Sequence, residues 1–491
     1  MSSNIRIAVI TDIHFSAFQS GKRLGQYGDV FLLRIVNRLN RFIKPDIVIV
    51  LGDIIDNAEE TDIGQRYKII RNILDKLKCP YIVIPGNHDI APDAFYDYFN
   101  APELVTQCKG YGFVSFPYDI ETPGYNAFRA NDQIDLMAYS RTKFGGPLIV
   151  IQHVPVAPAE KAPCYNYVNS EQIINSMRDN GIFLSISGHY HPGYELYGYN
   201  SMNFVSVASL CEEPFNFWLL DIEDEKVSVD KHQLKIPGKY RLYDNHTHTQ
   251  FAYCGENVSM SANLELADVF GLEGLCFSEH SGQLYQRQEL WNKLDFFHYG
   301  LENCKDVRRQ SVSDYINEAC SVGMNKEFIA LEVDIDANGE LVLFDEDREK
   351  AGFLIGAVHY LKEASKKNVD YKEICNEFMH QTQKLLELEI NILAHPFRVF
   401  RRNAMEPDQE LFDKMVKMLS MYDTAVEINF HTNDPPLAFF RKCLDAGIKI
   451  SLGSDAHNLY EIGEFYPHIE LLKKAGCNGN FSNMLTPCSM R

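Results

Sequence analysis

The sequence predicts an α/β protein built from two domains, and three observations lead to this prediction. First, apolar strand-like runs alternate with helical stretches over residues 5–84. Second, the short segment 236–239, which contains Pro237 and Gly238, is followed by a new series of strand-like runs. Third, 491 residues exceed what one hydrophobic core usually supports, and two larger domains fit this length best. We therefore place the domains at residues 1–238 and 239–491.

The first domain begins with a strand–helix–strand–helix–strand pattern. We expect strands at residues 5–10, 47–51 and 81–84, with one helix over about 29–44 and another ending near residue 78. Two later apolar runs, 148–151 and 183–186, each end in a loop that carries histidine. Residues 203–235 have the pattern of short alternating strands. We expect residues 91–146 to form specificity loops above the first site.

The second domain contains seven apolar runs, and helical stretches separate most of them. This alternation predicts a βα barrel. The runs cover residues 241–244, 274–278, 328–332, 353–358, 391–394, 424–428 and 448–452. Residues 281–309 are expected to form loops above the second site.

Composition restricts the class of protein and its partners. Hydrophobic residues make up 45% and charged residues 23%, which excludes extended disorder. The formal charge of −20 disfavours long nucleic acids, whereas small phosphorylated substrates remain compatible once divalent cations bind. The N-terminus does not have a secretory pattern, and no apolar run of 18 residues predicts a membrane helix. Twelve cysteines without a CxxC pair indicate reduced thiols, so we expect a cytoplasmic protein.

Polar motifs follow five predicted strands of the first domain. They are D-x-H, GD, GNHD, a single histidine and GHYH, and they supply Asp12, His14, Asp53, Asn87, His88, Asp89, His153, His189 and His191. Because each lies just past the C-terminal end of a strand, these residues can share one site. Mixed imidazole, carboxylate and amide groups suit two divalent cations such as Mn, Fe or Zn. Such a pair activates water and stabilises displacement at phosphorus, and a nearby imidazolium can protonate the leaving oxygen.

This ordered set of motifs resembles that of the calcineurin-like metallophosphoesterases, and its compact form is similar to the class III cyclic nucleotide phosphodiesterases. The resemblance implies a β-sandwich flanked by helices. It further implies one metal on Asp12, His14 and His191, a second on Asn87, His153 and His189, and Asp53 bridging both. His88 would be the catalytic proton donor, and both Asn87 and His88 would contact the phosphate. Asp56 and Asp89 fit equally well as helix caps or as groups that orient ligands.

A second set of polar residues follows the strands of the second domain. Its members are His246, His248, Glu279, His280, Glu332, His359, His395, Asp455 and His457. Catalytic residues of βα barrels gather at the C-terminal ends of the strands, so these side chains are expected to be neighbours. The other histidines, His232, His298, His380, His431 and His468, are expected at the surface or in the core, with His431 noted because it follows the sixth strand.

In order and spacing this second set resembles the polymerase-and-histidinol-phosphatase (PHP) family, which implies a distorted (β/α)7 barrel. The resemblance implies a first metal on His246, His248, Glu332 and Asp455, with Glu332 bridging to a second metal on His359 and His395. A third metal would use His280, His457 and Cys254, where many members have histidine in place of Cys254. Cys254 is either a thiolate ligand or a buried small residue. Arg398 either binds phosphate or forms an exposed salt bridge, and Glu427 is a candidate to orient a ligand.

The lead hypothesis is a bifunctional phosphoesterase with two metals in the first site and two or three in the second. The first site would open a phosphodiester, linear or cyclic, and the second would remove phosphate from the resulting monoester of a small metabolite or nucleotide. One alternative is a nuclease that acts on short oligonucleotides. Another is a protein in which one domain is catalytic and the other is a metal-stabilised sensor or interaction module.

Overall fold

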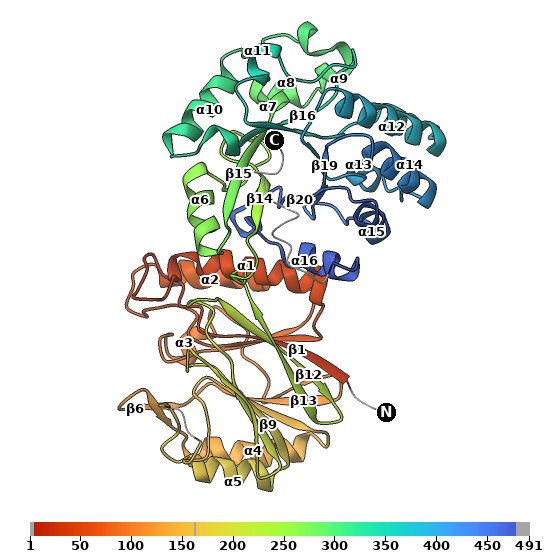
Figure 1. The fold of residues 1–491 in the computed structure, drawn as a ribbon. Helices are drawn as coiled ribbons and strands as arrows, with labels where there is room; N and C mark the ends of the chain where they lie inside the picture. The colour runs from red at the N-terminus through yellow and green to blue at the C-terminus, as the bar shows by residue number, and fades with distance from the viewer. Residues whose placement is uncertain (1–3, 162–163, 478–491) are drawn as a thin grey trace. The chain divides into compact units, whose positions relative to one another are not determined.

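The computed structural model describes residues 4–161 and 164–477, and the chain forms two compact units (Figure 1). The N-terminal unit is Met1–Lys235 and the C-terminal unit is Ile236–Arg491. The division therefore falls at the start of the predicted linker, whereas the sequence prediction places it after residue 238. Among the described residues, none of the helices has the length and apolar character needed to span a membrane.

The N-terminal unit contains two β-sheets. The first has the strand order β13-β12-β1-β2-β3, in which β1, β2 and β3 are parallel and β12 and β13 are antiparallel additions. Its strands are β1 (Asn4–Ile10), β2 (Ile47–Leu51), β3 (Tyr81–Ile84), β12 (Asn216–Glu223) and β13 (Lys226–Gln233). The second has the order β10-β11-β9-β8-β5-β4, with antiparallel edge strands. Its strands are β4 (Val105–Cys108), β5 (Tyr111–Phe116), β8 (Leu148–Gln152), β9 (Ile182–Ser187), β10 (Tyr194–Tyr199) and β11 (Met202–Ser206).

The two sheets pack face to face and form the core of this unit. Ile7 and Val9 of β1 pack in one cluster with Tyr111 of β5 and Ile151 of β8. Because successive side chains of a strand point to opposite faces, Ala8 is directed to the outer side, and it is also fully buried. Burial on both faces explains why the parallel strands appear in the sequence as continuous apolar runs.

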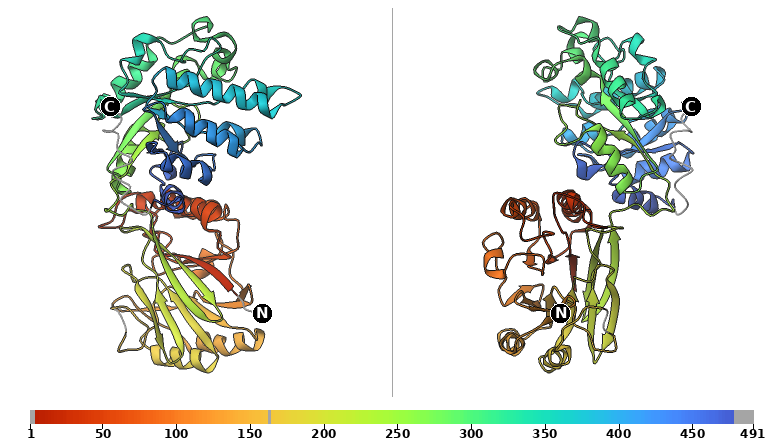
Figure 2. Two further views of the ribbon diagram at one scale, coloured as in Figure 1. Left: turned by 45° about the vertical axis from the view of Figure 1, so that its right-hand side comes forward. Right: turned by 90° about the vertical axis from the view of Figure 1, so that its left-hand side faces the viewer.

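Helices cover the outer faces of both sheets (Figure 2). The first sheet is covered by α1 (Gly28–Arg38), which continues as a π-helix (Leu39–Ile43), and by α2 (Ile63–Leu74). The second is covered by α4 (Asn131–Lys143) and α5 (Ser170–Asp179), whose Met137 and Ile173 pack with Val114 and Val150. The predicted β-sandwich flanked by helices is therefore confirmed.

The prediction that residues 91–146 form only loops is wrong. This segment contains α3 (Pro92–Phe95), the sheet strands β4 and β5, the small hairpin β6 (Ile120–Thr122) and β7 (Asn126–Phe128), and α4. All six residues of β5 are buried, because β5 pairs with β8 on one side and with β4 on the other. The cavity beside the first site is lined by the hairpin and its flanking turns, by Ala91 and Pro92 at the start of α3, and by Phe116 at the end of β5.

The C-terminal unit is built on seven parallel strands in sequence order, β14 to β20. They are β14 (Tyr243–Thr247), β15 (Gly274–His280), β16 (Ile329–Val333), β17 (Phe353–Gly356), β18 (Ile392–Leu393), β19 (Ala425–Ile428) and β20 (Ile450–Leu452). A parallel bridge between Thr247 and Ala456 brings the first strand beside the last, so the sheet forms a nearly closed barrel. The predicted seven-stranded barrel is confirmed.

Helices surround this barrel in Figures 1 and 2. They are α6 (Met260–Val269), α7 (Ser281–Tyr285), α8 (Gln288–Trp291), α9 (Asp295–Tyr299), α10 (Ser311–Ser321), α11 (Asp345–Arg348), α12 (Tyr371–Glu387), α13 (Arg398–Arg402), α14 (Gln409–Leu419), α15 (Leu437–Asp445) and α16 (Tyr466–Lys474). The first strand lies later than predicted, at 243–247 instead of 241–244, because its end pairs with both β15 and the segment after β20. His246 therefore lies inside a strand, and His248 follows it.

Two candidate metal sites

The predicted polar residues of the N-terminal unit come together where strands of both sheets end. Asp12 and His14 follow β1, Asp53 follows β2, Asn87 and His88 follow β3, His153 follows β8, and His189 and His191 follow β9. Asp12, His14, Asp53 and His189 all have positive φ, between 47° and 64°. This backbone conformation is costly for residues other than glycine and concentrates at functional sites.

Asp53 lies at the centre of this cluster. Its Oδ1 accepts a hydrogen bond from the backbone N–H of His88 at 2.9 Å. Its Oδ2 lies 3.4 Å from Nε2 of His14 and 3.3 Å from Nε2 of His153. Burial by itself raises the pKa of Asp53, but the charges of His153 and His14 outweigh it and hold the pKa well below its usual range. One carboxylate oxygen is thus fixed by the backbone, and the other lies between two groups of imidazoles.

The first group contains Asp12, His14 and His191. Oδ2 of Asp12 accepts hydrogen bonds from the hydroxyl of Thr11 at 2.6 Å and from the backbone N–H of His189 at 3.0 Å. Oδ1 of Asp12 lies 3.5 Å from Nε2 of His191, which in turn is 3.3 Å from Nε2 of His14. Three atoms of the kind that bind metals therefore converge from two loops, the loop after β1 and the loop after β9.

The second group contains Asn87, His153 and His189. Nε2 of His153 lies 3.1 Å from Oδ1 of Asn87 and 3.1 Å from Nδ1 of His189. The far nitrogens of both rings bond to backbone carbonyls, Nδ1 of His153 to Leu51 at 2.6 Å and Nε2 of His189 to Tyr125 at 2.9 Å. Because a carbonyl only accepts, these contacts place the protons on the far nitrogens and leave lone pairs facing the cluster.

The structure decides between the two interpretations of Asp56 and Asp89. Oδ1 of Asp56 lies 3.1 Å from Nδ1 of His14, so Asp56 orients a candidate ligand. Asp89 accepts hydrogen bonds from the backbone N–H groups of Ile54, Ile55 and Gly86 and from the Tyr67 hydroxyl. It therefore ties the GD loop to the GNHD loop, and burial together with the nearby charge of Asp53 raises its pKa to about 7. Neither residue caps a helix.

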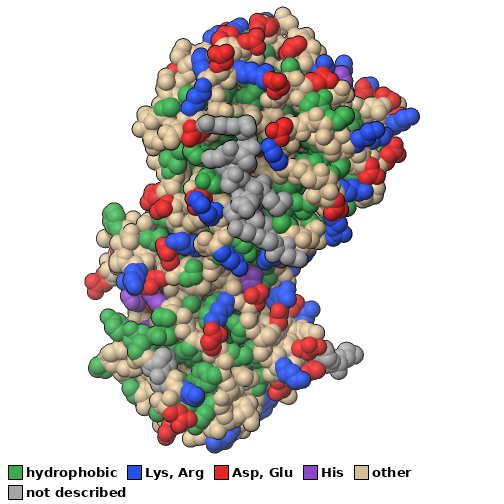
Figure 3. Space-filling view, viewed as in Figure 1, with side chains coloured by type: hydrophobic (Ala, Val, Ile, Leu, Met, Phe, Trp, Pro, Cys, Tyr) green, Lys and Arg blue, Asp and Glu red, His purple; other side chains and the backbone are tan. Residues whose placement is uncertain are grey.

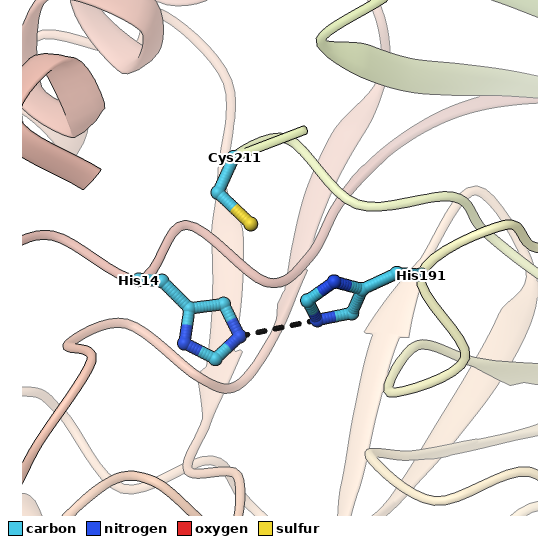
Figure 4. Close-up of side chains that lie close together, drawn as sticks. All are labelled: His14, His191 and Cys211. Carbon is cyan, nitrogen blue, oxygen red and sulfur yellow. Dashed lines mark hydrogen bonds between the residues drawn. The ribbon is translucent and has the colours of Figure 1, made fainter. Parts of the chain in front are cut away.

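Two residues beside this site were missed by the sequence analysis. Cys211 is fully buried, and its sulfur lies within 4.8 Å of ring nitrogens of His14 and His191 (Figure 4). Oε1 of the next residue, Glu212, accepts a hydrogen bond from Nδ1 of His191 at 2.8 Å. Both belong to the loop between β11 and β12, which carries no recognisable motif. Their only sequence signal is a position just after a strand of the second sheet.

Glu332 is the centre of the C-terminal cluster. Its Oε2 lies 2.6 Å from Nδ1 of His280 and 3.5 Å from Nε2 of His246. Its Oε1 lies 2.9 Å from Nε2 of His395 and 3.4 Å from Nε2 of His359. Burial raises the pKa of Glu332, but the charges of His280, His246 and His359 more than compensate and hold it well below its usual range. The two oxygens thus face different sets of histidines.

Asp455 and His248 complete the first of these sets. Nε2 of His248 lies 3.0 Å from Oδ1 of Asp455 and 3.7 Å from Oε2 of Glu332. Both residues are fully buried, and Asp455 adopts a φ of 54°. Asp455 is positioned by the bond from its own backbone N–H to the carbonyl of His246 at 2.7 Å, which joins β20 to β14.

Buried carboxylates hold the histidines of this cluster from behind. Nδ1 of His246 bonds to Oε1 of Glu427 at 2.8 Å, and Glu427 also accepts the backbone N–H of His395 at 2.8 Å. Glu427 therefore has the orienting role for which it was a candidate. Nδ1 of His359 bonds to Asp334 at 3.0 Å, and Nδ1 of His248 lies 3.4 Å from Glu279. Asp334 was not among the predicted site residues, although it lies only two residues after Glu332.

Cys254 is an exposed residue, so the alternative of a buried small side chain is wrong. It lies beside His280 and His457, and its sulfur accepts a hydrogen bond from Nε2 of Gln283 at 3.3 Å. Neighbouring side chains partly desolvate the sulfur and by themselves raise the pKa of the Cys254 thiol, yet the hydrogen bonds and charges of His280 and His457 lower this pKa to about 3. A thiolate next to two imidazoles has the character of a metal ligand.

Arg398 does not form an exposed salt bridge, because it is only 2% exposed. Its Nη1 pairs with Oδ2 of Asp455, and its Nη2 lies 2.9 Å from Nε2 of His359 and 2.6 Å from Nε2 of His395. The guanidinium thus lies among the candidate metal ligands.

Each cluster borders a cavity. A cavity of about 180 Å³ reaches Asn87, His153 and His189, and one of about 530 Å³ reaches Cys254, His280 and Arg398. His431, expected at the surface or in the core, lines the larger cavity, where its ring stacks on His457 at 4.4 Å and its Nδ1 bonds to Glu461 at 2.9 Å. On the face drawn in Figure 3, histidine side chains reach the surface at the left edge of the N-terminal half, and acidic and basic side chains are interspersed.

The donor atoms present fit divalent cations in both units. Oδ1 of Asp12, Nε2 of His246 and Oε2 of Glu332 are buried and make no hydrogen bond within residues 4–161 and 164–477. A buried polar atom without a partner is costly, and all three point toward other donor atoms. Imidazole and carboxylate donors are those that borderline divalent metals prefer.

A helix-flanked β-sandwich and a seven-stranded barrel, each with its own cluster of imidazoles and carboxylates, define a metal-dependent phosphoric ester hydrolase of two domains. Comparison with known families agrees. The calcineurin-like phosphoesterase model matches residues 5–193, and the PHP domain model matches residues 244–431. A region of the N-terminal unit is therefore similar to the calcineurin-like phosphoesterases, and a region of the C-terminal unit is similar to PHP domains.

Individual relatives are similar to parts of the chain. A probable cyclic nucleotide phosphodiesterase of Coxiella burnetii is 26% identical over 235 residues, which cover 45% of this chain and 90% of that protein. A probable glycerophosphodiester phosphodiesterase of Arcobacter nitrofigilis is 41% identical over 123 residues, 23% of this chain and 43% of that protein. A solved dimetal phosphatase from Danio rerio aligns over 47% of this chain and 98% of its own, with 14% identity and a TM-score of 0.39.

Proposed function

We propose that the chain catalyses two consecutive hydrolyses. The N-terminal site opens a phosphodiester, including a cyclic nucleotide, and the C-terminal site releases phosphate from the monoester that results. The observation that carries this proposal is that each unit has its own buried carboxylate, Asp53 or Glu332, between two groups of imidazoles. The names of the relatives from Coxiella burnetii and Arcobacter nitrofigilis favour a diester for the first reaction.

In the N-terminal unit two divalent cations, of the Mn, Fe or Zn type, would be held by the two groups around Asp53. Asp12, His14 and His191 would bind one, and Asn87, His153 and His189 the other. When bound, the cations supply Lewis acidity at the phosphoryl oxygens and activate water. His88 donates its Nδ1–H to the carbonyl of Asp56 at 2.6 Å, so when the ring is an imidazolium its Nε2 carries the second proton, which it can give to the leaving oxygen. The amide of Asn87 and the ring of His88 also contact the phosphate.

In the C-terminal unit Glu332 would be shared by two cations. His246, His248 and Asp455 would complete the first position, and His359 and His395 the second. Cys254, His280 and His457 would form a third position, which the thiolate character of Cys254 supports. The guanidinium of Arg398 binds the phosphate group of the monoester and orients it toward these positions.

The test is the fate of a 3′,5′-cyclic nucleotide incubated with the protein and Mn²⁺. The wild type is expected to release inorganic phosphate, whereas His246→Ala with His248→Ala is expected to stop at the nucleoside monophosphate. Phosphate release by this variant at the wild-type rate would show that the proposal is wrong. Degradation of short oligonucleotides without activity on mononucleotides would identify a nuclease instead. If both units bind metal but only one hydrolyses any ester, the other unit is a sensor or interaction module.

A further inference from the structure

The larger cavity has one wall of aromatic side chains. Trp291, Phe297 and Tyr360 all line it, and all three are half-buried. The rings form a continuous row: Trp291 packs on Phe296 at 5.4 Å, Phe296 on Phe297 at 4.3 Å, and Phe297 on Tyr360 at 5.1 Å between ring centroids. Phe296 is fully buried and anchors the row. The cavity therefore presents large apolar rings held in fixed positions.

The backbone is shaped to hold the indole of Trp291. A Cβ on Gly282 would lie 2.5 Å from the ring carbon Cζ3 of Trp291, so glycine in α7 is what allows the indole to lie against this helix. The indole is close to parallel with the ring of His280, with 29° between the planes and 6.1 Å between centroids. A flat aromatic surface thus lies next to a candidate metal ligand.

The other walls of the same cavity are polar, and their charges differ. Arg398 and Arg402 are the basic residues of the lining, and Glu256 and Glu461 are its acidic residues, with Glu461 accepting the backbone N–H of His457 at 3.0 Å. Burial and the neighbouring charge of Arg398 lower the pKa of Arg402, and the charges of Asp455 and Glu332 oppose this shift. The carboxylates can accept hydrogen bonds from hydroxyl or amino groups, and they repel further phosphates.

We propose that the C-terminal site takes a nucleoside monophosphate whose base stacks on the Trp291–Phe297–Tyr360 wall, which rests on the proposed function of this unit as a phosphomonoesterase. The phosphate lies toward Arg398, the sugar and base edge lie toward Glu256 and Glu461, and the base covers the rings. Bases stack readily on aromatic side chains because every base has a flat face. A cavity of about 530 Å³ accommodates a ligand of this size, and a sugar phosphate without a base would leave the rings uncovered.

Binding can be measured without turnover. The chain has two tryptophans, and Trp218 is buried in β12 of the other unit, so in Trp218→Phe the tryptophan emission comes from Trp291. Adenosine monophosphate is expected to quench this emission saturably, and ribose 5-phosphate at the same concentrations is not. Equal quenching by both compounds, or none by either, would overturn the proposal.

Kinetics provides a second readout. Trp291→Ala is expected to raise KM for adenosine monophosphate by about five- to a hundredfold and to leave KM for ribose 5-phosphate unchanged. Trp291→Phe keeps an aromatic ring at this position, so its KM for adenosine monophosphate is expected to be close to that of the wild type. Tyr299→Ala is the matched control, because Tyr299 is exposed and does not line the cavity.

The two proposals fail in different ways. If the wild type releases phosphate from no monoester, the phosphatase function is wrong, and the fluorescence titration alone decides the nucleotide site. If ribose 5-phosphate is hydrolysed as efficiently as adenosine monophosphate and Trp291→Ala changes both alike, the phosphatase function stands and the aromatic recognition is wrong.

Discussion

Several candidate ligands share one feature at the scale of single residues: the ring is fixed by an acceptor behind it. His153 bonds to the carbonyl of Leu51, His191 to Glu212, His246 to Glu427 and His359 to Asp334. These contacts select the tautomer and orient the ring before any ion arrives. The geometry of both sites therefore depends on residues outside the motifs.

Glu427→Gln tests this dependence. The amide keeps the size of the side chain but removes the charge that holds Nδ1 of His246, so the affinity of the C-terminal site for Mn²⁺ is expected to fall about 10- to 100-fold. The measurement is metal titration followed by phosphate release from a monoester. Glu410→Gln is the control, since Glu410 is an exposed residue that pairs with Lys414. Unchanged metal affinity in Glu427→Gln would contradict an orienting role.

At the scale of elements, the first site depends on two loops that approach each other very closely. Gly52 has a φ of +87°, and a Cβ there would lie 2.4 Å from the backbone nitrogen of Gly86. A Cβ on Gly86 would lie 2.2 Å from Oδ1 of Asp53, the atom that bonds to His88. Glycine is thus required at both positions for the loops to place Asp53.

Gly86→Ala is therefore expected to reduce hydrolysis of the diester by at least about a hundredfold, because displacement of reacting groups by about 1 Å has this effect. Monoester hydrolysis by the other unit is expected to continue unchanged, which shows that the chain is folded. Gly145→Ala is the matched control, because a Cβ on Gly145 meets nothing within 4 Å. Diester hydrolysis at the wild-type rate in Gly86→Ala would show that the loops tolerate movement of Asp53.

Helix α16 supplies a pH dependence of stability that is separate from the metal ligands. His468 is buried between Phe430 and Phe465, its Nε2 donates to the carbonyl of Gly453 at 3.1 Å, and burial lowers its pKa to about 4. In the unfolded chain the imidazole of His468 is protonated near pH 6.5. The full contribution of the neutral buried ring to the free energy of unfolding is therefore present above that pH. It is lost as the pH falls from about 6.5 to about 4, by on the order of 3 kcal/mol.

The measurement is chemical unfolding followed by Trp291 emission in the Trp218→Phe background, between pH 4.5 and 7. In His468→Phe the free energy of unfolding of this unit is expected to change less steeply with pH, because the titrating group is gone. The difference between the two slopes isolates His468 from other groups that titrate in this range. Parallel slopes would show that His468 is protonated in the folded unit.

At the scale of the whole molecule, both sites could be predicted where a motif directly follows a strand. Asp12 and Asp53 are examples, and Glu332 is one of the last two residues of β16, because parallel strands bring such residues to one edge of a sheet or one end of a barrel. Cys211 and Asp334 could not be predicted in the same way. Cys211 reaches the first site only through the packing of the β11–β12 loop, and the role of Asp334 depends on which direction the ring of His359 faces.

The fold was predictable to a similar degree. Most parallel strands are continuous apolar runs and were found, and the seven strands of the barrel appear in order, whereas β5 was missed although it pairs in parallel with β8. The edge strand β4, in contrast, has one buried, one exposed and two half-buried residues and is only four residues long. It is defined by its pairing with β5, which lies in the next segment of the chain. The sequence pattern of β4 alone therefore does not show that these residues form a strand.

The central claim is that one chain carries two separate hydrolytic sites that act in sequence, and mixing two defective variants tests it most directly. With a 3′,5′-cyclic nucleotide and Mn²⁺, Asp53→Asn alone is expected to leave the substrate intact, and His246→Ala with His248→Ala alone is expected to accumulate the monophosphate. An equimolar mixture of the two is expected to release inorganic phosphate. A mixture that stops at the monophosphate, or an Asp53→Asn variant that releases phosphate by itself, would contradict the account.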